Sequence, residues 1–271
     1  MGFIYNNSKY KIYIRGGIMK IITVTNQKGG TGKTSTTNAL MAGLQKKGYK
    51  VLAVDLDPQC NLSFILKTDL SKPTALGILT GEAKIKDTIQ QSEIGDFIAS
   101  SKQLSNADKL LDSVGREYKL KKALESVKAD YDFILIDTPP ALSILTINAL
   151  TACNSVIIPA IADIFSLQGI ERLAETIEPI KEYTNSSLYI EGILLTKYTG
   201  DRTNLNKSLR ETAKKTAEKL NTKLFDTVIR ESVTVKESQL MLSNVFDYAP
   251  KASVTADYEN FINELLQSEV K

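Results

Sequence analysis

KIITVTNQKGGTGKT, at residues 20–34, is the most informative stretch of this 271-residue chain. Residues 21–25 form a β-branched apolar run, which predicts a buried strand. Three glycines follow, and then Lys33 and Thr34 open an Ala- and Leu-rich run that predicts a helix. Glycines let backbone N–H groups turn toward an anion, and a helix N-terminus adds partial positive charge. The stretch therefore predicts a phosphate-binding loop.

The loop departs from the common pattern G-x-x-x-x-G-K-[ST], because Gln27 stands where that pattern has its first glycine, and it carries an additional lysine, Lys28. In such loops the lysine reaches the β- and γ-phosphates and the next hydroxyl ligates Mg²⁺, which gives these roles to Lys33 and Thr34. The alternative, a glycine-rich turn with chance lysines, is disfavoured by the flanking strand and helix. The candidate nucleotide-binding residues are Lys28, Gly29, Gly30, Thr31, Gly32, Lys33, Thr34 and Ser35.

Two further predicted strands lead into aspartates. Residues 49–54 precede Asp55 and Asp57, and the apolar run at 132–136 precedes Asp137. Alternation places Asp55 and Asp57 on one side of their strand, and open α/β sheets bind ligands at the carboxyl edge. A carboxylate in this place can hold Mg²⁺ through water, which is the role that we expect for Asp137. The alternative for Asp55 and Asp57 is a solvated turn.

Strands and helices alternate along most of the chain, which predicts an α/β fold with a mostly parallel sheet and helices on both faces. Residues 61–130 are mostly helical in pattern, and 70–95 have no clear pattern. With no repeat or low-complexity linker, we expect residues 19–271 to form a single domain. The expected strands are 21–25, 49–54, 96–100, 132–136, 155–159, 188–196 and 224–229, and the expected helices are 35–47, 142–152, 167–183, 203–221 and 258–266.

Residues 1–18 differ from the rest of the chain. They carry three bases and no acid, and they lack the cleavage site and apolar core of a signal peptide. We expect a disordered extension or an added strand or, if Met19 is the true start, an untranslated extension. Removing three of the 34 bases leaves 31 against 31 acids, so the +3 charge of the whole chain does not indicate nucleic-acid binding.

Composition excludes several kinds of site. The chain has no histidine, which excludes histidine-based catalysis and histidine metal ligands. Its two cysteines, Cys60 and Cys153, lack metal-site spacing, which indicates a reduced cytoplasmic protein. No apolar run is long enough to span a bilayer.

A basic run and an amphipathic helix lie in the C-terminal part. Residues 197–236 contain ten bases and five acids, and such a run is most often a solvated helix face. The polar side of the closing helix, at 258–266, carries acids and amides, which an anionic membrane would not attract. We therefore expect that helix to pack on the protein, with no membrane partner. The buried stripe expected for the helix at 203–221 is Leu205, Leu209, Ala213 and Leu220.

Several motifs together resemble a known family. They are K-G-G-T-G-K-T at 28–34, V-D-L-D-P-Q at 54–59, I-D-T-P-P at 136–140, L-T-I-N-A-L at 145–150 and D-R-T-N-L at 201–205. In order and spacing the chain resembles the deviant-Walker P-loop ATPases of the MinD/ParA superfamily, and within them the ParA/Soj branch, which partitions plasmids and chromosomes. The resemblance runs from Met19 to near the C-terminus.

The resemblance implies an ATP hydrolase that uses ATP and Mg²⁺ and acts as an ATP-dependent homodimer. It implies that Lys28 reaches across a nucleotide-sandwich dimer to the partner's phosphates, where it would stabilise developing charge. Asp57 matches the carboxylate that positions the attacking water. The catalytic residues implied are Lys28, Lys33 and Asp57, and the metal residues implied are Thr34, Asp55 and Asp137.

The resemblance also implies partners. The ATP-bound dimer would bind DNA without reading its sequence, and a ParB-type centromere-binding protein would stimulate hydrolysis and release the dimer. The expected location is the cytoplasm, on the nucleoid. Arg202 matches an arginine that contacts DNA in this branch. The expected DNA-binding residues are Arg202, Lys207 and Lys236.

Two positions depart from the family pattern. Cys60 stands where the family usually has glycine, so the loop after Asp57 is expected to differ. Thr234 stands where an arginine is common, so Lys236 or Arg230 would have to supply the positive charge near the second basic site.

Two other classes of function are weighed against this one. A MinD-like membrane-associated positioning ATPase needs a basic amphipathic C-terminal helix, whereas the helix here has an acidic polar side. An electron donor like the nitrogenase iron protein needs two cluster cysteines per subunit, and Cys60 and Cys153 do not lie at the expected places.

Overall fold

A seven-stranded sheet forms the centre of the molecule. The computed structural model describes residues 19–201 and 203–268, so the expected extension at 1–18 lies outside the described residues. The strands are β1 (Lys20–Val24), β2 (Val51–Asp55), β3 (Ile89–Ser92), β4 (Gly95–Ile98), β5 (Phe133–Asp137), β6 (Ser155–Ile161) and β7 (Tyr189–Thr196). Their order is β3-β4-β2-β5-β1-β6-β7, and only β3 pairs antiparallel to its neighbour among the described strands.

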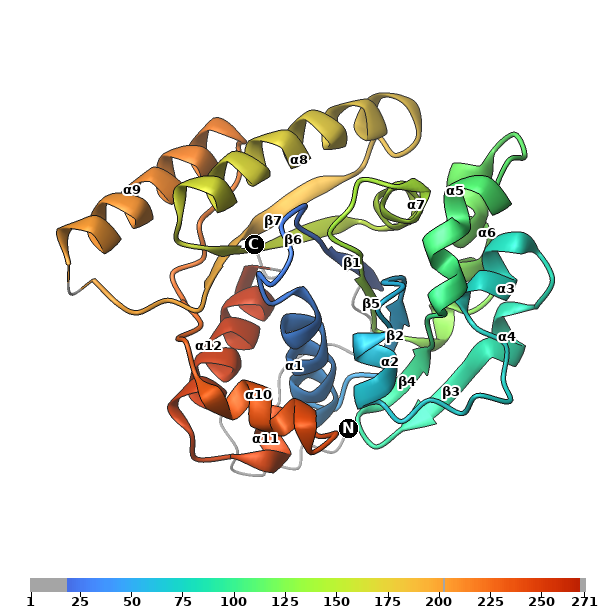
Figure 1. Cartoon of the computed structure of the whole chain (residues 1–271), viewed down its shortest axis with the longest axis horizontal. Helices are drawn as coiled ribbons and strands as arrows, with labels where there is room; N and C mark the ends of the chain where they lie inside the picture. The colour runs from blue at the N-terminus through green and yellow to red at the C-terminus, as the bar shows by residue number, and fades with distance from the viewer. Residues whose placement is uncertain (1–18, 202, 269–271) are drawn as a thin grey trace, which may run out of the picture.

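Helices cover both faces of this sheet (Figure 1). The α-helices are α1 (Lys33–Lys46), α2 (Asn61–Ile65), α3 (Ala75–Thr80), α4 (Ile85–Thr88), α5 (Ala107–Leu110), α6 (Lys119–Leu124), α7 (Ile144–Ala152), α8 (Ile164–Tyr183), α9 (Asn204–Lys219), α10 (Val233–Leu240), α11 (Val245–Tyr248) and α12 (Ser253–Ser268). The predicted fold, a mostly parallel sheet between two layers of helices, is confirmed.

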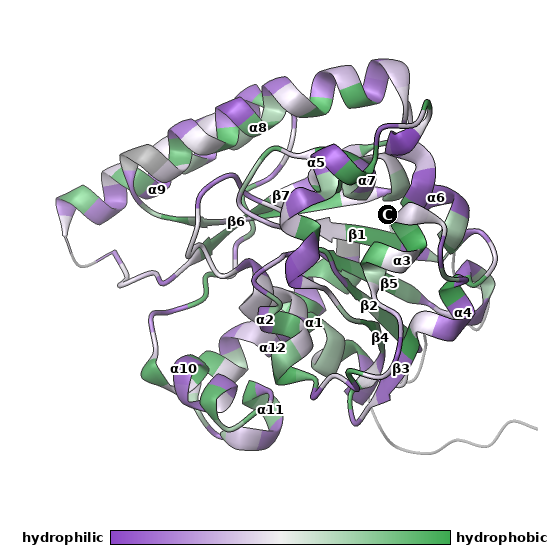
Figure 2. Cartoon of the chain, turned by 45° about the vertical axis from the view of Figure 1, so that its right-hand side comes forward, coloured by the Kyte–Doolittle hydropathy of each residue, from purple (hydrophilic) through white to green (hydrophobic). Residues whose placement is uncertain are grey.

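Each face of the sheet has its own apolar core. Along β5, Ile134 and Ile136 pack in one core, together with residues of α7 and α8, whereas Phe133 and Leu135 pack in the other, together with residues of α1 and α12. This alternation follows from the two-residue repeat of a strand. Figure 2 shows the strands as largely hydrophobic and the outer helices as mixed. A sheet that is buried on both faces gives the residues at its edge a rigid support.

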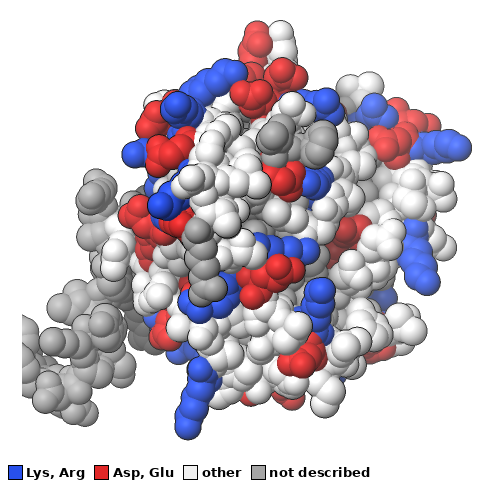
Figure 3. All heavy atoms as spheres, turned by 60° about the vertical axis from the view of Figure 1, so that its left-hand side comes forward, with Lys and Arg blue, Asp and Glu red and all other residues white. Residues whose placement is uncertain are grey.

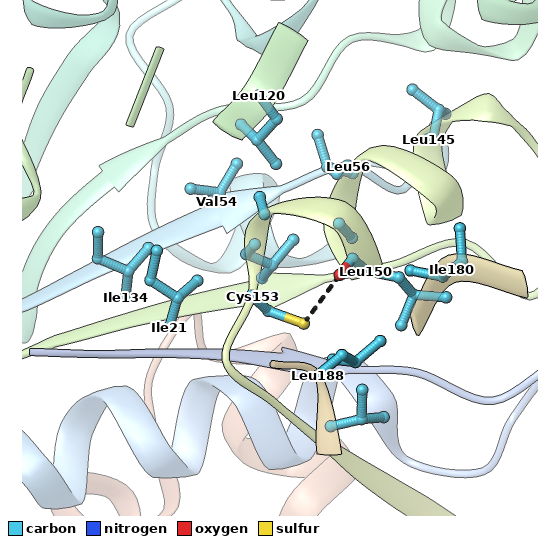
Figure 4. Packing of buried hydrophobic residues seen from close by; sticks show 14 of the residues in the cluster. Ile21, Val54, Leu56, Leu120, Ile134, Leu145, Leu150, Cys153, Ile180 and Leu188 are labelled. Carbon is cyan, nitrogen blue, oxygen red and sulfur yellow. Dashed lines mark hydrogen bonds between the residues drawn. The ribbon is translucent and has the colours of Figure 1, made fainter. Parts of the chain in front are cut away.

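Cys153 follows α7 and lies in the core behind β1, surrounded by apolar side chains (Figure 4). Its Sγ lies 3.6 Å from the carbonyl oxygen of Leu150, and burial raises the pKa of the thiol to about 12. Nearby, the Thr23 hydroxyl donates to the carbonyl oxygen of Ala149 at 3.1 Å, which ties β1 to α7. The thiol is therefore protonated at neutral pH and acts as a small apolar side chain.

The strand expected at residues 224–229 is wrong. This segment pairs with β7 only at separate points: an isolated bridge at Leu224, and a hydrogen bond from the N–H of Ile229 to the carbonyl oxygen of Leu195 at 2.8 Å. The reason lies in the closing helix, because the carboxylate of Glu264 accepts the N–H groups of Asp226 and Thr227 at 2.8 and 2.9 Å. Backbone donors that are bound by a side chain cannot also extend a strand ladder.

One other expectation for local structure needs correction, and one segment that the sequence left unassigned has structure. Leu205, expected in the buried stripe of α9, is 65% exposed, because the first turn of this helix projects at the edge of the molecule (Figure 1). Ala213, in the same stripe, is buried as expected. The segment 70–95, in which no pattern was clear, contains α3, α4 and β3. Short elements with polar residues leave little periodicity to detect.

Candidate nucleotide-binding site

The sheet brings the ends of three strands to one place. β5 lies between β1 and β2, and the parallel register sets Asp137 opposite both Val24 and Asp55. The loop after β1 and the two carboxylates therefore meet at the carboxyl edge of the sheet, where open α/β sheets bind ligands. The predicted neighbourhood of loop and aspartates follows from this strand order.

The loop has the backbone conformation of a tight anion-binding turn. Gly30 and Gly32 have φ angles of 75° and 87°, a region that side chains rarely tolerate. The hydroxyl of Thr196 in β7 donates to the carbonyl oxygen of Thr31 at 2.7 Å, so the loop is also braced from the side. Sequence reasoning missed Thr196, because it lies 165 residues from its partner.

Lys33 opens α1 and is only 6% exposed. Burial lowers the pKa of its ammonium group, and the nearby charges of Asp137 and Asp57 act in the opposite direction. The ammonium group donates to the carbonyl oxygen of Lys28 at 3.2 Å, which is a neutral acceptor. A desolvated cation with a neutral partner at the start of a helix is well prepared to bind phosphate oxygens.

Asp55 and Asp137 are 1% and 0% exposed and lie on adjacent strands. Burial raises the pKa of Asp55 to about 6. Burial also raises the pKa of Asp137 well above its usual range, the charge of Asp55 adds to this, and Thr34 and Lys33 oppose it. Among the described residues, Oδ2 of Asp137 has no hydrogen-bond partner. Two desolvated carboxylates and a hydroxyl form an oxygen donor set that suits Mg²⁺.

Two serines that sequence reasoning missed hold the carboxylates in place. Ser63, in α2, donates to Oδ2 of Asp55 through its N–H at 2.9 Å and its hydroxyl at 2.6 Å. Ser100 donates through its N–H to the Ser63 hydroxyl at 2.8 Å and through its hydroxyl to the Asp57 carbonyl oxygen at 2.7 Å. The Asp57 N–H in turn donates to Oδ1 of Asp55 at 3.0 Å. This network fixes the backbone of Asp57 relative to Asp55.

Cys60 precedes α2 with a φ of 56°, in the left-handed region. A glycine would adopt this conformation without strain, whereas Cys60 holds it with a side chain. Burial raises the pKa of the Cys60 thiol, so it is not an activated nucleophile.

A cleft of about 930 Å³ opens beside the loop, in the size range of small-molecule sites. α10 and the segment before it form the opposite wall. Gln239 joins the two walls, because its Nε2 donates to the Ser35 hydroxyl at 2.9 Å. Arg230 lies at the rim, where two of its nitrogens donate to Asp257 at 2.6 and 2.8 Å. The Arg230 charge is therefore paired within the chain.

Lys28 does not line the cleft with the other loop residues. Its Nζ lies 2.9 and 2.7 Å from the two carboxylate oxygens of Asp163, at the N-terminus of α8. Sequence reasoning did not identify Asp163.

The expected DNA-binding residues that the structure describes, Lys207 and Lys236, lie on two different helices. Arg202 lies outside the described residues, Lys207 is exposed on α9, and Lys236 is on α10 at the rim of the cleft. Figure 3 shows basic and acidic side chains interspersed over the face turned to the viewer. No helix within the described ranges, 19–201 and 203–268, is long and apolar enough to cross a membrane.

Known proteins resemble the chain over most of its length. Residues 19–190 match the family model for an AAA domain. The sporulation initiation inhibitor protein Soj of Bacillus subtilis is 38% identical over 252 residues, which cover 91% of this chain and 98% of that protein. The chromosome partitioning protein ParA of Caulobacter vibrioides is 34% identical over 259 residues, which cover 93% and 95%.

Structural similarity agrees with sequence similarity. The septum site-determining protein MinD of Pyrococcus horikoshii, complexed with Mg-ADP, has a TM-score of 0.75 and 26% identity, and the match covers 92% of this chain and 96% of that one. The family model matches more than half of this chain, and the curated relatives are matched almost end to end. The chain therefore belongs to the ParA/Soj family of P-loop ATPases.

Proposed function

We propose that this chain is a DNA-partition ATPase, a switch in which ATP and Mg²⁺ close a homodimer that binds DNA without sequence preference. The observation that carries the proposal is that Lys33 and Asp57 line one cleft while Asp137 lies buried at the same edge of the sheet, opposite Asp55. The charges of Asp137 and Asp57 both act to raise the pKa of Lys33. The names of relatives support the biological role, because one is a chromosome partitioning protein. In this proposal residues 19–271 act as a single ATPase domain.

Each site residue has a part in hydrolysis. Lys33 and the loop backbone bind the phosphates, and Lys28 of a second copy adds positive charge where the γ-phosphate leaves. Asp57, fixed by the serine network, orients the attacking water. Bound Mg²⁺ would be held by Thr34, Asp55 and Asp137 and would neutralise phosphate charge. The desolvated carboxylates suit this cation. The related MinD structure, which contains Mg-ADP, supports the same assignment.

DNA binding would depend on dimer formation. A single copy presents exposed cations such as Lys207 and Lys236 on helices that also carry exposed acids, Glu211 and Glu237, so each copy binds DNA phosphates weakly. Linking two such surfaces multiplies their affinity, because the second surface binds at a high effective concentration. Arg202 would add to the same contacts. A ParB-type protein that stimulates hydrolysis would then release the dimer, and we expect a cytoplasmic protein that associates with the nucleoid.

A MinD-like positioning ATPase is the second candidate, favoured by the similarity to the archaeal MinD structure. That role needs a C-terminal helix that is available to a membrane. Here α12 packs on α1 through Phe261, Ile262 and Leu265. Its exposed side carries Glu259, and Glu264 is bound by the backbone of residues 226–227. Co-sedimentation with anionic liposomes in ATP distinguishes the two roles, and we expect no ATP-dependent sedimentation.

The experiment that tests the proposal is the variant Asp57→Ala. It should bind ATP and unrelated DNA as the wild type does, but turn ATP over at least about 100-fold more slowly, because the water is no longer oriented. Turnover is measured by phosphate release and DNA binding by fluorescence anisotropy. Unchanged turnover would remove Asp57 from the mechanism, and loss of DNA binding with intact ATP binding would contradict the switch.

A further inference from the structure

Asp163 and Lys28 form an ion pair at the edge of the phosphate-binding loop. Both carboxylate oxygens lie within 2.9 Å of the Lys28 Nζ, and each side chain is 33% exposed. Asp163 is also the N-cap of α8, where its Oδ1 accepts the N–H of Ser166 at 2.8 Å. One carboxylate thus caps a helix and binds the ammonium group that the proposed mechanism needs elsewhere.

The backbone of Lys28 is held independently of its side chain. Its N–H donates to Oδ1 of Asn26 at 2.9 Å, and its carbonyl oxygen accepts from Lys33 at 3.2 Å. Asn26 is itself anchored, because its Nδ2 donates to the carbonyl oxygen of Pro159 at 2.8 Å. A lysine stem has four flexible carbons, so the ammonium group can change partners while the loop stays in place.

We infer that Asp163 is a positioning residue that holds Lys28 in the separate copy, and that Lys28 exchanges Asp163 for phosphate oxygens of a second copy's ATP when the dimer forms. The inference rests on the proposed function of Lys28. In the nucleotide-free chain the Asp163 carboxylate binds the Lys28 ammonium group, as a phosphate would do in the dimer. It therefore opposes dimer formation until a more highly charged partner, the triphosphate, arrives.

The size of the effect follows from the exposure of the pair. A partly exposed ion pair changes an equilibrium by up to about fivefold. A symmetric dimer breaks two such pairs, so Asp163 should raise the dimer dissociation constant by up to about 25-fold.

The variant Asp163→Asn tests the inference. It removes the charge but keeps an oxygen for the Ser166 N–H, so α8 retains its N-cap. Sedimentation velocity across a range of protein concentrations, with a non-hydrolysable ATP analogue and Mg²⁺, should show the dimer forming at several-fold lower concentration than in the wild type. With ADP the variant should stay as monomeric as the wild type, because there is no γ-phosphate to receive Lys28.

A matched control is Asp247→Asn. Asp247 forms a similar partly exposed pair with Lys46, at 2.7 Å, and neither residue lines the cleft. This substitution should leave the dimerisation midpoint unchanged. A second variant, Asp163→Ser, also provides an N-cap oxygen without a charge and should shift the midpoint in the same direction as Asp163→Asn.

The outcomes separate the inference from the proposed function. If the wild type does not dimerise with the ATP analogue, the proposed function fails. If the wild type dimerises and both Asp163 variants behave as Asp247→Asn does, or need more protein, the inference is overturned while the proposed function stands. An equal shift with ADP and with the ATP analogue would also overturn it, because a structural change in α8 would act on both states alike.

Discussion

The nucleotide cleft and the exposed faces of α9 and α10 differ in whether their charged side chains are buried or exposed. At the cleft and the sheet edge beside it, Lys33, Asp55 and Asp137 are almost fully buried, and hydrogen bonds hold Lys33 and Asp55 in place. On α9 and α10, Lys207 and Lys236 are exposed, and the same helices carry the exposed acids Glu211 and Glu237. Buried charges are costly, so they are kept only where a partner compensates them. One copy of the chain therefore forms most of the nucleotide site by itself. The exposed lysines, in contrast, are expected to bind DNA tightly only when two copies form a dimer.

The largest effect is expected for Lys33→Ala, which changes the cleft and leaves the exposed lysines of α9 and α10 in place. Loss of a desolvated cation at the phosphates should reduce hydrolysis by roughly 100- to 1,000-fold and abolish nucleotide-dependent DNA binding. Phosphate release and anisotropy measure the two effects. Lys47→Ala, which removes an exposed lysine at the other end of α1, is the control and should behave as the wild type. Nucleotide-dependent DNA binding by Lys33→Ala would contradict the account.

The next largest effect concerns the cost of burying Asp55. Its pKa is about 6 in the folded chain, against 3.8 when exposed, so the folded state holds its proton more strongly. The nucleotide-free protein should therefore lose stability as pH rises between about 4 and 6, by on the order of 3 kcal/mol from this group.

Asp55→Asn should remove this loss. We expect the variant to be more stable than the wild type at about pH 8 and to lose the difference at about pH 4, in thermal denaturation without nucleotide. It should also lose any stabilisation by Mg²⁺ with ATP. A wild type that gains stability steadily from pH 4 to about pH 8, with no benefit from the substitution, would show that burial does not strain this carboxylate.

A smaller effect is expected on the surface. Lys207→Ala should lower the slope of log affinity against log salt by about 0.9 for each DNA phosphate that the lysine no longer neutralises, or about 1.8 for a dimer, while turnover stays unchanged. DNA titrations at several salt concentrations measure the slope. Lys84→Ala, an exposed lysine beside α4 on the opposite edge of the sheet, is the control. Equal slopes for Lys207→Ala and Lys84→Ala would place the DNA surface elsewhere.

The smallest effect is expected at Cys60, whose backbone has a strained left-handed conformation. A left-handed conformation costs a side-chain-bearing residue about 1–2 kcal/mol, and a glycine costs about 0.5–1 kcal/mol in the unfolded chain. Cys60→Gly should therefore raise the free energy of unfolding by about 0.5–1 kcal/mol, whereas Cys60→Ala, which keeps the strain, should not. Denaturant titration of both variants measures the difference.

The sequence was most informative where chemistry is local. The strand-loop-helix unit around Lys33, and the aspartates that directly follow β2 and β5, can be recognised because each signal lies within a few residues. The parallel sheet follows from alternating elements, and its order then brings Asp55 and Asp137 together. These parts of the site needed no knowledge of distant contacts.

The parts that could not be predicted depend on residues far apart in the chain. Ser63 and Ser100 contact each other across 37 residues, Asp163 lies 135 residues from Lys28, and Gln239 lies 204 residues from Ser35. Serine, aspartate and glutamine are common on surfaces, so no local pattern marks them. The wrong prediction of a strand at 224–229 has the same cause, because Glu264, a distant residue in the closing helix, binds two N–H groups of this segment.

The central claim is that nucleotide state, set in the cleft, controls DNA binding at the surface. The most direct test is a titration of unrelated DNA sequences with the purified protein in ATP, in ADP and without nucleotide, at two salt concentrations. The account predicts tight, sequence-blind and salt-sensitive binding in ATP alone. Equal binding in all three states, or no binding in any of them, would contradict it.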